Sequence, residues 1–304
     1  MKIPPPRGVW EICAGIIALA LVVGRAEAGG LQTVASLDSG SGDIPQAGLI
    51  AVGGTLYGTA AFGGANSDGT LFSWSSGNGL TTLASFDGAN GANPQAGLLA
   101  VGGTLYGTTY GGGAAPGDGT LFSWSASNGL STLASFDGTN GANPQARLLA
   151  VGGTLYGTTT GGGASGDGTL FSYASGTLTT LVNFDYPIGA YPHGGLLAVG
   201  GTLYGTTDYG GANSDGTLFS WSPGNGLTTL ASFDGTTGTE PFYALTDVGG
   251  TLYGTAQYGG ASNGGVIFSY TPASQSVPEP GSLPLLLAGL GGLGALTWRR
   301  SRAL

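Results

Sequence analysis

The amino-acid sequence predicts an all-β protein: a single β-propeller of five blades with four strands in each blade. Three observations predict it. A motif returns about every 49 residues, each repeat contains four short strand candidates, and no helical apolar period occurs between residues 31 and 270. Four strands in a repeat of about 40 to 50 residues are typical of propeller blades. We therefore expect residues 29–272 to form the folded domain, between an N-terminal signal and a C-terminal membrane segment.

Residues 1–28 have the pattern of a secretory signal peptide. Lys2 and Arg7 precede an apolar run at residues 13–23, and Ala26 and Ala28 occupy the two positions that a signal peptidase reads. An uncleaved N-terminal anchor is the alternative. The single cysteine of the chain lies in this apolar run. Cleavage would therefore leave a chain that is stabilised by packing and backbone hydrogen bonds, without disulfides.

Two sequence markers recur in step through the middle of the chain. The tyrosine of Thr-Leu-Tyr-Gly returns after 49, 50, 48 and 49 residues, at Tyr57, Tyr106, Tyr156, Tyr204 and Tyr253. The aspartate of Ser-Phe-Asp and its variants returns with the same spacings, at Asp38, Asp87, Asp137, Asp185 and Asp234. A drift of one residue that two markers share indicates one repeated structural unit.

The second repeat illustrates the four strands that we expect in every unit. They lie at residues 98–101, 104–109, 120–124 and 130–136. Gly102 and Gly103 should join the first two strands as a two-residue hairpin, because both glycines can take positive φ. Gly119 breaks the chain before the third strand, and Asn128-Gly129 makes the turn into the fourth.

The aromatic residues at the end of the third strand are expected to pack the blades together. They are Trp74, Trp124, Tyr173, Trp221 and Tyr270, in one register through the five repeats. The five tyrosines of Thr-Leu-Tyr-Gly are likewise expected to pack rather than to bind a ligand.

The ends of the repeated region predict that the propeller closes through its N-terminal strand. The last repeat stops after its third strand, at Tyr270. Residues 31–38 read LQTVASLD and match the fourth-strand sequence LTTLASFD at residues 227–234. We therefore expect residues 31–37 to form the fourth strand of the last blade, an offset that a linear solenoid would not need.

The repeated motifs resemble a known bacterial repeat. The set Gly-Gly-Thr-Leu-Tyr-Gly-Thr, Tyr-Gly-Gly and Asp-Gly-Thr-Leu-Phe-Ser resembles the GloVer-type tandem repeat of bacterial surface proteins over about four-fifths of the chain. The resemblance implies an exported, propeller-like protein and no established activity. The paired glycines also resemble kelch repeats, but the spacing differs, so no kelch function is transferred.

The last part of the chain, residues 273–304, carries three features in order after a short linker. They are the motif Val277-Pro278-Glu279-Pro280, an apolar segment at residues 283–298, and the basic residues Arg299, Arg300 and Arg302. As a helix the apolar segment would reach about 24 Å, slightly less than a hydrocarbon core of about 30 Å. We expect this transmembrane helix to hold the chain in the membrane before processing.

The order of these features resembles the PEP-CTERM sorting signal of Gram-negative bacteria. The resemblance implies an exosortase-type membrane protease as a partner, cleavage near the Pro-Glu-Pro, and delivery to the cell surface or the exopolysaccharide matrix. A membrane anchor that is never processed is the alternative.

The charge balance excludes nucleic acid as a partner. Between residues 29 and 277 the sequence has thirteen Asp and Glu residues, and Arg147 is the one Lys or Arg. Nucleic-acid phosphates require many such cations. The acidic balance keeps an exported domain soluble, and it fits a binding module and a purely structural surface protein equally well.

One face of the predicted propeller should carry a ligand-binding surface. The loop from the fourth strand to the next first strand and the loop from the second to the third strand should both emerge there. The candidate residues are Phe62, Tyr110, Tyr209 and Tyr258 in the second loop type, with Thr160 breaking the series, and Asn93, Gln95, Asn143, Gln145, His193 and Glu240 in the first.

Aromatic side chains beside neutral and acidic hydrogen-bonding groups suit the apolar faces and hydroxyls of sugars. We therefore hypothesise non-catalytic, multivalent binding of extracellular polysaccharide or other matrix components. The alternative is that these aromatics only pack the loops.

A glycan-cleaving hydrolase or lyase is the rival hypothesis. Glycoside hydrolysis needs two carboxyl groups about 5 to 10 Å apart, and a single active centre should break the repeat symmetry. The ionisable residues that break it are Asp43, Arg147, His193, Asp208, Glu240 and Asp247. The sequence has no Ser-His-Asp arrangement, metal-ligand cluster or phosphate loop with a lysine, so we predict no catalytic residue.

Two further sets of aspartates recur in the repeats. Asp68, Asp118, Asp167 and Asp215 precede Gly-Thr at the third strand, and we expect them to bond local backbone N–H groups in turns. A calcium site would use Asp87, Asn90 and Asn93, or Asp137, Asn140 and Asn143. Calcium takes six to eight oxygens with several carboxylates, and each loop offers one carboxylate. We therefore predict no cofactor or metal, with calcium as the weaker alternative.

Overall fold

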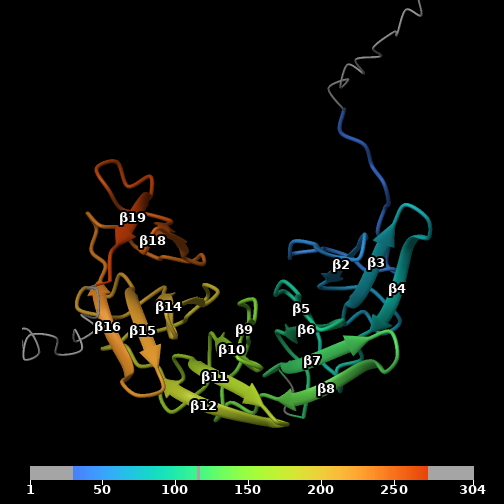
Figure 1. The fold of residues 1–304 in the computed structure, drawn as a ribbon, viewed down its shortest axis with the longest axis horizontal. Coiled ribbons are helices and arrows are strands. Elements are labelled where there is room, and N and C mark those ends of the chain that lie inside the picture. Colours follow the sequence, from blue (N-terminus) through green and yellow to red (C-terminus); the bar gives the residue numbers. More distant parts are fainter. Residues whose placement is uncertain (1–29, 115–116, 273–304) are drawn as a thin grey trace, which may run out of the picture. The chain divides into compact units, whose positions relative to one another are not determined.

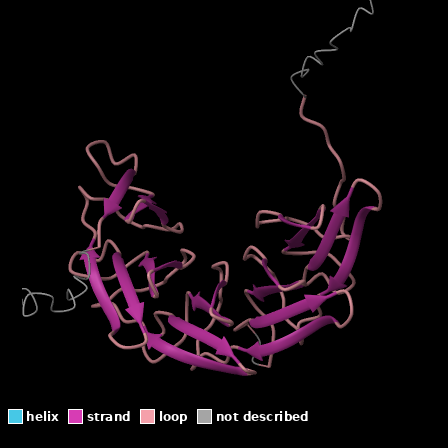
Figure 2. Ribbon diagram, viewed as in Figure 1, coloured by secondary structure: helices cyan, strands magenta, loops and turns pink. Residues whose placement is uncertain are grey.

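The structure is a computed structural model that describes residues 30–114 and 117–272. The named secondary-structure elements in these ranges are all β-strands (Figure 2). These ranges contain no helix that is long and apolar enough to cross a membrane. The predicted signal peptide at residues 1–28 and the predicted sorting segment at residues 273–304, with its helix at 283–298, lie outside the described residues.

The strands form antiparallel sheets that each contain one sequence repeat (Figure 1). Sheet 1 contains β1 (Ile50–Val52), β2 (Thr55–Ala60), β3 (Thr70–Ser75) and β4 (Gly79–Ser85). Sheet 2 contains β5 (Leu99–Val101), β6 (Thr104–Thr109), β7 (Thr120–Ser125) and β8 (Gly129–Ser135). Sheet 3 contains β9 (Leu149–Val151), β10 (Thr154–Thr159), β11 (Thr169–Ala174) and β12 (Thr177–Asn183). Sheet 4 contains β13 (Leu197–Val199), β14 (Thr202–Thr207), β15 (Thr217–Ser222) and β16 (Gly226–Ser232). Sheet 5 contains β17 (Thr246–Val248), β18 (Thr251–Ala256) and β19 (Val266–Tyr270).

The four strands predicted for the second repeat are confirmed, with ends that differ by one residue at most. Gly102 and Gly103 have φ angles of 57° and 81°, as the predicted two-residue hairpin requires. Gly129 has a φ of 66° and follows Asn128 in the turn into β8. These turns are encoded locally, which is why the sequence predicts them well.

The drift in repeat length comes from two loops. The loop between β6 and β7 covers residues 110–119, one residue more than its equivalent at residues 61–69 in sheet 1. The turn between β11 and β12 consists of Ser175 and Gly176 alone, where the other four-stranded sheets have three residues. Both of its residues have positive φ, 51° and 80°. The strands themselves keep their lengths.

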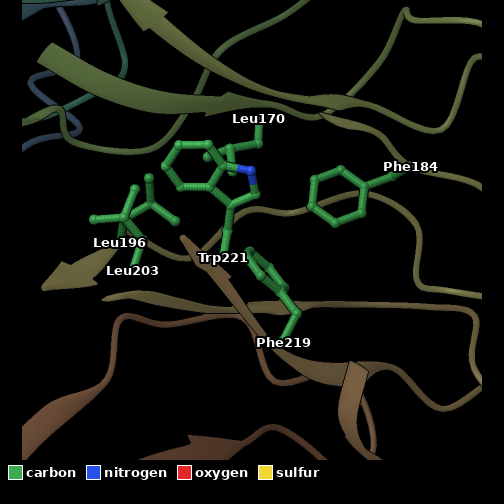
Figure 3. Close-up of a cluster of buried hydrophobic side chains, with 6 residues drawn as sticks. All are labelled: Leu170, Phe184, Leu196, Leu203, Phe219 and Trp221. Atoms are coloured by element: carbon green, nitrogen blue, oxygen red, sulfur yellow. The ribbon is translucent and has the colours of Figure 1, made fainter. Parts of the chain in front are cut away.

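Neighbouring sheets pack together through buried apolar clusters. The phenylalanine that follows the fourth strand of one sheet meets a phenylalanine on the third strand of the next, as in Phe136 with Phe171, whose ring centroids are 5.1 Å apart. The equivalent pair between sheets 3 and 4 is Phe184 with Phe219. Figure 3 shows these two rings beside Trp221 and the leucines of the same cluster. The core is thus divided into one cluster per junction, as in other repeat proteins.

The prediction of a strand at residues 31–37 is wrong. These residues form no strand, Leu31 is fully exposed, and sheet 5 consists of β17, β18 and β19 in the described structure. A segment with a strand-like sequence becomes a strand only where a neighbouring edge supplies its hydrogen bonds. Its sequence similarity to residues 227–234 says nothing about whether such an edge is offered.

Candidate functional site

Each repeat brings two loops together at one end of its sheet. The loop that leads into the next first strand forms a short antiparallel bridge with the loop that follows the second strand. The bridged pairs are Asp43 with Phe62, Ala92 with Gly111, Ala142 with Gly161, Ala190 with Tyr209, and Thr239 with Tyr258. This confirms the expectation that both loop types lie together, and we call this end of the sheets the loop face.

Buried threonines hold the loops on the sheets. Thr109 Oγ1 lies 2.8 Å from Thr120 Oγ1, and the Thr120 hydroxyl donates to the carbonyl of Asn90 in the first loop. Sheets 3 and 4 contain the same pair. Sheet 1 has Ala60 opposite Thr70, and the Thr70 hydroxyl donates to the carbonyl of Ser41 in the first loop. Sheet 5 has Ala256 and Val266 at the two positions. The buried threonine of sheet 1 thus keeps a hydrogen-bond partner, as burial requires.

The predicted series of four equivalent aromatic residues is wrong for one member, Tyr110. Phe62, Tyr209 and Tyr258 occupy the bridge position and are 41%, 37% and 47% exposed. Tyr110 lies one residue earlier, at the position of Asp208, and it is half-buried. The local motif Tyr-Gly-Gly suggested a false equivalence, because in the second repeat Gly111 occupies the bridge position and Tyr110 precedes it.

Of the predicted asparagines and glutamines, Asn143 has side-chain hydrogen bonds to the neighbouring loop. Asn143 donates from Nδ2 to the carbonyls of Tyr110 and Gly117, at 2.9 and 2.7 Å. Asn93 is half-buried, and its Oδ1 is buried without a hydrogen-bond partner. Gln95 and Gln145 are half-buried two positions further on.

One position in this loop takes a left-handed backbone in all repeats. Its residues are Ile44, Asn93, Asn143, Tyr191 and Glu240, with φ between 54° and 58°. Asparagine tolerates this conformation, whereas bulkier side chains adopt it at a cost. Ile44, Tyr191 and Glu240 therefore adopt a left-handed backbone conformation that their side chains disfavour. Such strained residues are often found at functional sites.

Tyr209 lies between Tyr191 and Glu240, two of those strained residues. Its hydroxyl donates to Glu240 Oε1 at 3.1 Å, and its ring meets the Tyr191 ring edge to face at a centroid distance of 5.9 Å. Burial, together with the hydrogen bond to Glu240 and the negative charge of that residue, raises the pKa of the Tyr209 phenol. The phenol therefore stays protonated and remains a hydrogen-bond donor at neutral pH.

The side chains of His193 and Asp208 are in contact beside this tyrosine. His193 Nδ1 lies 2.5 Å from Asp208 Oδ2, and the Asp208 side chain is almost completely buried. The imidazole stacks on the ring of Phe242, with centroids 4.5 Å apart. We call Tyr191, His193, Asp208, Tyr209, Glu240 and Phe242 the fourth-repeat cluster.

The structure therefore joins only some of the residues that break the repeat symmetry. His193 meets Asp208 directly, and Glu240 is connected to the cluster through Tyr209. Arg147 lies elsewhere and donates from Nε to the carbonyl of Leu98. Sequence reasoning missed Tyr191 and Phe242. Their signal was present, since they replace the Asn and Gln of the second and third repeats.

Two known sequence families match this chain. Residues 24–201 and 173–280 match the model of the Gloeobacter/Verrucomicrobia repeat. The chain belongs to this repeat family. Residues 276–302 match the PEP-CTERM protein-sorting motif, which indicates an exported, surface-associated protein of a Gram-negative bacterium and implies processing by an exosortase. No curated protein matches this member of the Gloeobacter/Verrucomicrobia repeat family.

Two solved structures are similar to this Gloeobacter/Verrucomicrobia repeat protein at low sequence identity. BamB from Moraxella catarrhalis is 16% identical, with a TM-score of 0.46, and the match covers 74% of this chain and 57% of BamB. The WD40 beta propeller domain of Doa1 is 13% identical, with a TM-score of 0.49, and the match covers 74% of this chain and 66% of that domain. The chain thus spans little more than half the length of BamB.

The aspartates of the Ser-Phe-Asp series close turns in this repeat protein. Asp87 Oδ1 accepts from the backbone N–H of Asn90, and Asn90 Oδ1 accepts from the N–H of Asp87. Asp137 and Asp234 accept backbone and threonine hydroxyl bonds in the same way. The carboxylate and amide oxygens of Asp87, Asn90, Asp137 and Asn140 thus accept from turn N–H groups. The described residues contain no cluster of three His, Cys, Asp or Glu side chains that could hold a metal ion.

The prediction that the other aspartate series bonds local backbone N–H groups in turns is wrong, because its backbone carbonyls instead join one loop to the next. The carbonyls of Asp68, Asp118, Asp167 and Asp215 accept the N–H of the left-handed residue in the next loop. In the described residues it is the Ser-Phe-Asp series whose carboxylates bond the local backbone.

Acid should weaken the turn that Asp234 closes. Hydrogen bonds from Thr236 and then Thr237 hold the pKa of this carboxyl well below its usual range. The charged form therefore stabilises the folded chain above about pH 4, the ordinary pKa of aspartate, and this contribution is lost as the pH falls through the lower folded pKa. Urea unfolding of the wild type and Asp234→Asn should differ most at pH 7 and less below pH 4. A difference that is equal at pH 7 and pH 3 would contradict this account.

Proposed function

We propose that this exported protein is a non-catalytic binding module that holds extracellular polysaccharide through weak sites on its loop face. The observation that carries the proposal is Tyr209, an exposed ring whose hydroxyl is fixed by Glu240 and whose edge is fixed by Tyr191. An aromatic ring that is held in place can cover the apolar face of a sugar without losing much side-chain entropy. The neighbouring carboxylate offers an acceptor for sugar hydroxyls.

Repetition supports binding of a polymer. Phe62 and Tyr258 occupy the same bridge position as Tyr209 in other repeats and are similarly exposed. Several weak contacts on one molecule raise the overall affinity for a ligand that itself repeats. The thirteen acidic residues and single arginine between residues 29 and 277 favour a neutral polymer over an anionic one.

The architecture that we propose for this role is a five-bladed propeller. Support comes from the repeat length and from the antiparallel sheets, one per repeat, of which four have four strands and the fifth has three in the described residues. We further propose that residues 1–28 are removed on export, and that the segment 273–304 holds the protein in the membrane through a helix at 283–298 until an exosortase cleaves it. Delivery to an exopolysaccharide matrix would bring the loop face to its ligand.

Binding of the exopolysaccharide from the producing cells tests the proposal. In the full-length protein, Tyr209→Ala should lower the affinity by a factor of about five, which corresponds to roughly 1 kcal/mol for one aromatic contact. Replacing Phe62, Tyr209 and Tyr258 together should abolish detectable binding. Tyr253→Ala is the matched control, because this tyrosine is 41% exposed but lies on β18. Equal loss in the control, or no binding by the wild type, would leave a purely structural surface protein as the better interpretation.

The second candidate is a glycan-cleaving enzyme, and the contact between His193 and the buried Asp208 favours it. A buried carboxylate that orients an imidazole is a common way of preparing a general acid or base. Glu240 would supply a further carboxyl group. New reducing ends formed by the wild type and lost in Glu240→Gln would establish this candidate, whereas binding without turnover would exclude it.

A further inference from the structure

Two junctions between sheets hold a tryptophan against a tyrosine. Trp124 of sheet 2 meets Tyr57 of sheet 1, and Trp221 of sheet 4 meets Tyr156 of sheet 3, in both cases with centroids 6.0 Å apart and tilted rings. The valines that end the first strands of sheets 1 and 3 are half-buried in the same clusters. At these junctions the indole therefore belongs to the packing between the sheets.

The junction between sheets 2 and 3 departs from this pattern in two ways. Tyr173 stands where Trp124 and Trp221 stand in their sheets, and the turn that follows it is one residue shorter. Tyr106 and Tyr173 form no ring pair of the kind seen at the other two junctions. Val101, the equivalent of the half-buried valines, is 41% exposed.

A cleft of about 270 Å³ occupies this junction. Its lining includes Val101, Tyr106, Ala150, Leu155, Tyr173 and Ser175. Most of the lining is apolar, with the tyrosine and serine side chains as its polar groups, and no charged side chain takes part. The volume is slightly below the usual range for ligand pockets, about 300 to 1,000 Å³, which suits a single small ring system.

A tyrosine at this position does not by itself open a cleft. Tyr270 also replaces the tryptophan at the junction between sheets 4 and 5, yet its partner Tyr204 is only 9% exposed and Val199 is half-buried. The junction between sheets 2 and 3 combines the smaller side chain with the shortened turn of Ser175 and Gly176. Its open space is therefore a particular feature of this junction.

We propose that the cleft between sheets 2 and 3 is a binding site for a neutral, planar aromatic ring system of the size of an indole. The molecule itself indicates the ligand class, because equivalent sites hold an indole against the equivalent tyrosine. Apolar cavities in proteins bind rings that restore the missing contacts. The Ser175 hydroxyl in the lining can accept a hydrogen bond from the ring N–H.

This site is separate from the loop face. Gly152, Gly153 and Ser175 in its lining belong to the turns that precede β10 and follow β11, whereas the loops of the loop face follow β10 and precede β11. The two sites therefore lie at opposite ends of the same strands. Loss of binding at one leaves the other intact, so the two proposals can fail independently.

Ligand-observed NMR with indole and the full-length protein tests the proposal. We expect saturation transfer to indole in the wild type, and a signal at least about fivefold weaker in Tyr173→Trp, where the new side chain fills the cleft as at the other junctions. This variant should also melt at a higher temperature, because it restores lost contacts. Val101→Asp, a change at a partly exposed position, should weaken indole binding through its charge and serves if Tyr173→Trp folds poorly.

Three comparisons make the result decisive. Tyr253→Trp makes the same chemical change on β18 and should leave the indole signal unchanged. N-acetyltryptophanamide, if bound as well as indole, identifies the source as a tryptophan side chain of a partner, whereas binding of indole alone identifies a free small aromatic. Absence of the indole signal in the wild type, or an undiminished signal in both cleft variants, would overturn the site. A signal for methyl β-D-glucopyranoside that Tyr173→Trp removes, without one for indole, would overturn the ligand class.

Discussion

Replacing Gly168 by alanine should destabilise the protein by about 3 kcal/mol or more. Gly168 has a φ of 103°, and a Cβ there would overlap the backbone carbonyl oxygen of Thr159 and lie 2.8 Å from Cδ of Pro192. A left-handed conformation costs a residue with a side chain about 1–2 kcal/mol, and forcing a methyl group into filled space costs about 1–3 kcal/mol. The two costs add because one arises from the backbone conformation of residue 168 and the other from its overlap with a backbone carbonyl and a proline ring, which are both rigid groups.

Gly166→Ala separates these two causes. Gly166 also has a positive φ, 84°, but nothing lies within 4 Å of the position of its Cβ. It should therefore lose only the backbone part, about 1–2 kcal/mol. Urea unfolding of both variants measures the difference. Equal losses would mean that the contact with Thr159 and Pro192 contributes nothing.

Phe171→Ala should remove about 3–5 kcal/mol, the usual cost of deleting a buried phenylalanine. The Phe171 ring is completely buried, meets Phe136 edge to face, and lies against Gly157, where an added Cβ would come within 2.5 Å of its Cζ. The absence of a side chain at Gly157 is thus part of the packing of this ring. Its loss leaves a cavity at the junction of sheets 2 and 3 that the flanking strands cannot close.

Phe62→Ala is the matched control for that change. Phe62 is 41% exposed on the loop face, so its deletion should cost less than about 1 kcal/mol. Thermal unfolding should show a fall on the order of 10 °C for Phe171→Ala, at about 2–4 °C per kcal/mol for a domain of this size, and a small change for Phe62→Ala. A comparable fall in both would show that the junction clusters do not dominate stability.

Local signals explain which parts of the fold are predictable from sequence. Gly102-Gly103 and Asn128-Gly129 each fix a turn through residues that accept positive φ, and the strands between such turns follow. The strand expected at residues 31–37 had no such local test. It depended on a distant partner edge, and a match to residues 227–234 could not establish that pairing.

The sequence predicted which residues lie at the loop face, but it did not predict which of their side chains are in contact. The repeated loops already indicated that Tyr209, His193 and Glu240 belong to one end of the sheets. The pairing of His193 with Asp208 was not visible, because it joins two loops through a backbone bridge. The motif Tyr-Gly-Gly misplaces Tyr110, which directly follows the end of β6 and so lies one residue before the bridge position.

The sequence by itself determined the repeat, the strands that each unit contributes to its own sheet, the turns and the sorting motif, since each depends on residues close together in the chain. The tertiary structure alone decided which symmetry-breaking side chains meet, and that Tyr173 and a shortened turn leave a cleft where two other junctions hold an indole. The physical reason is that contacts between loops and between sheets depend on complementary shape across distant segments, and side-chain volume at one position has meaning only against its partner.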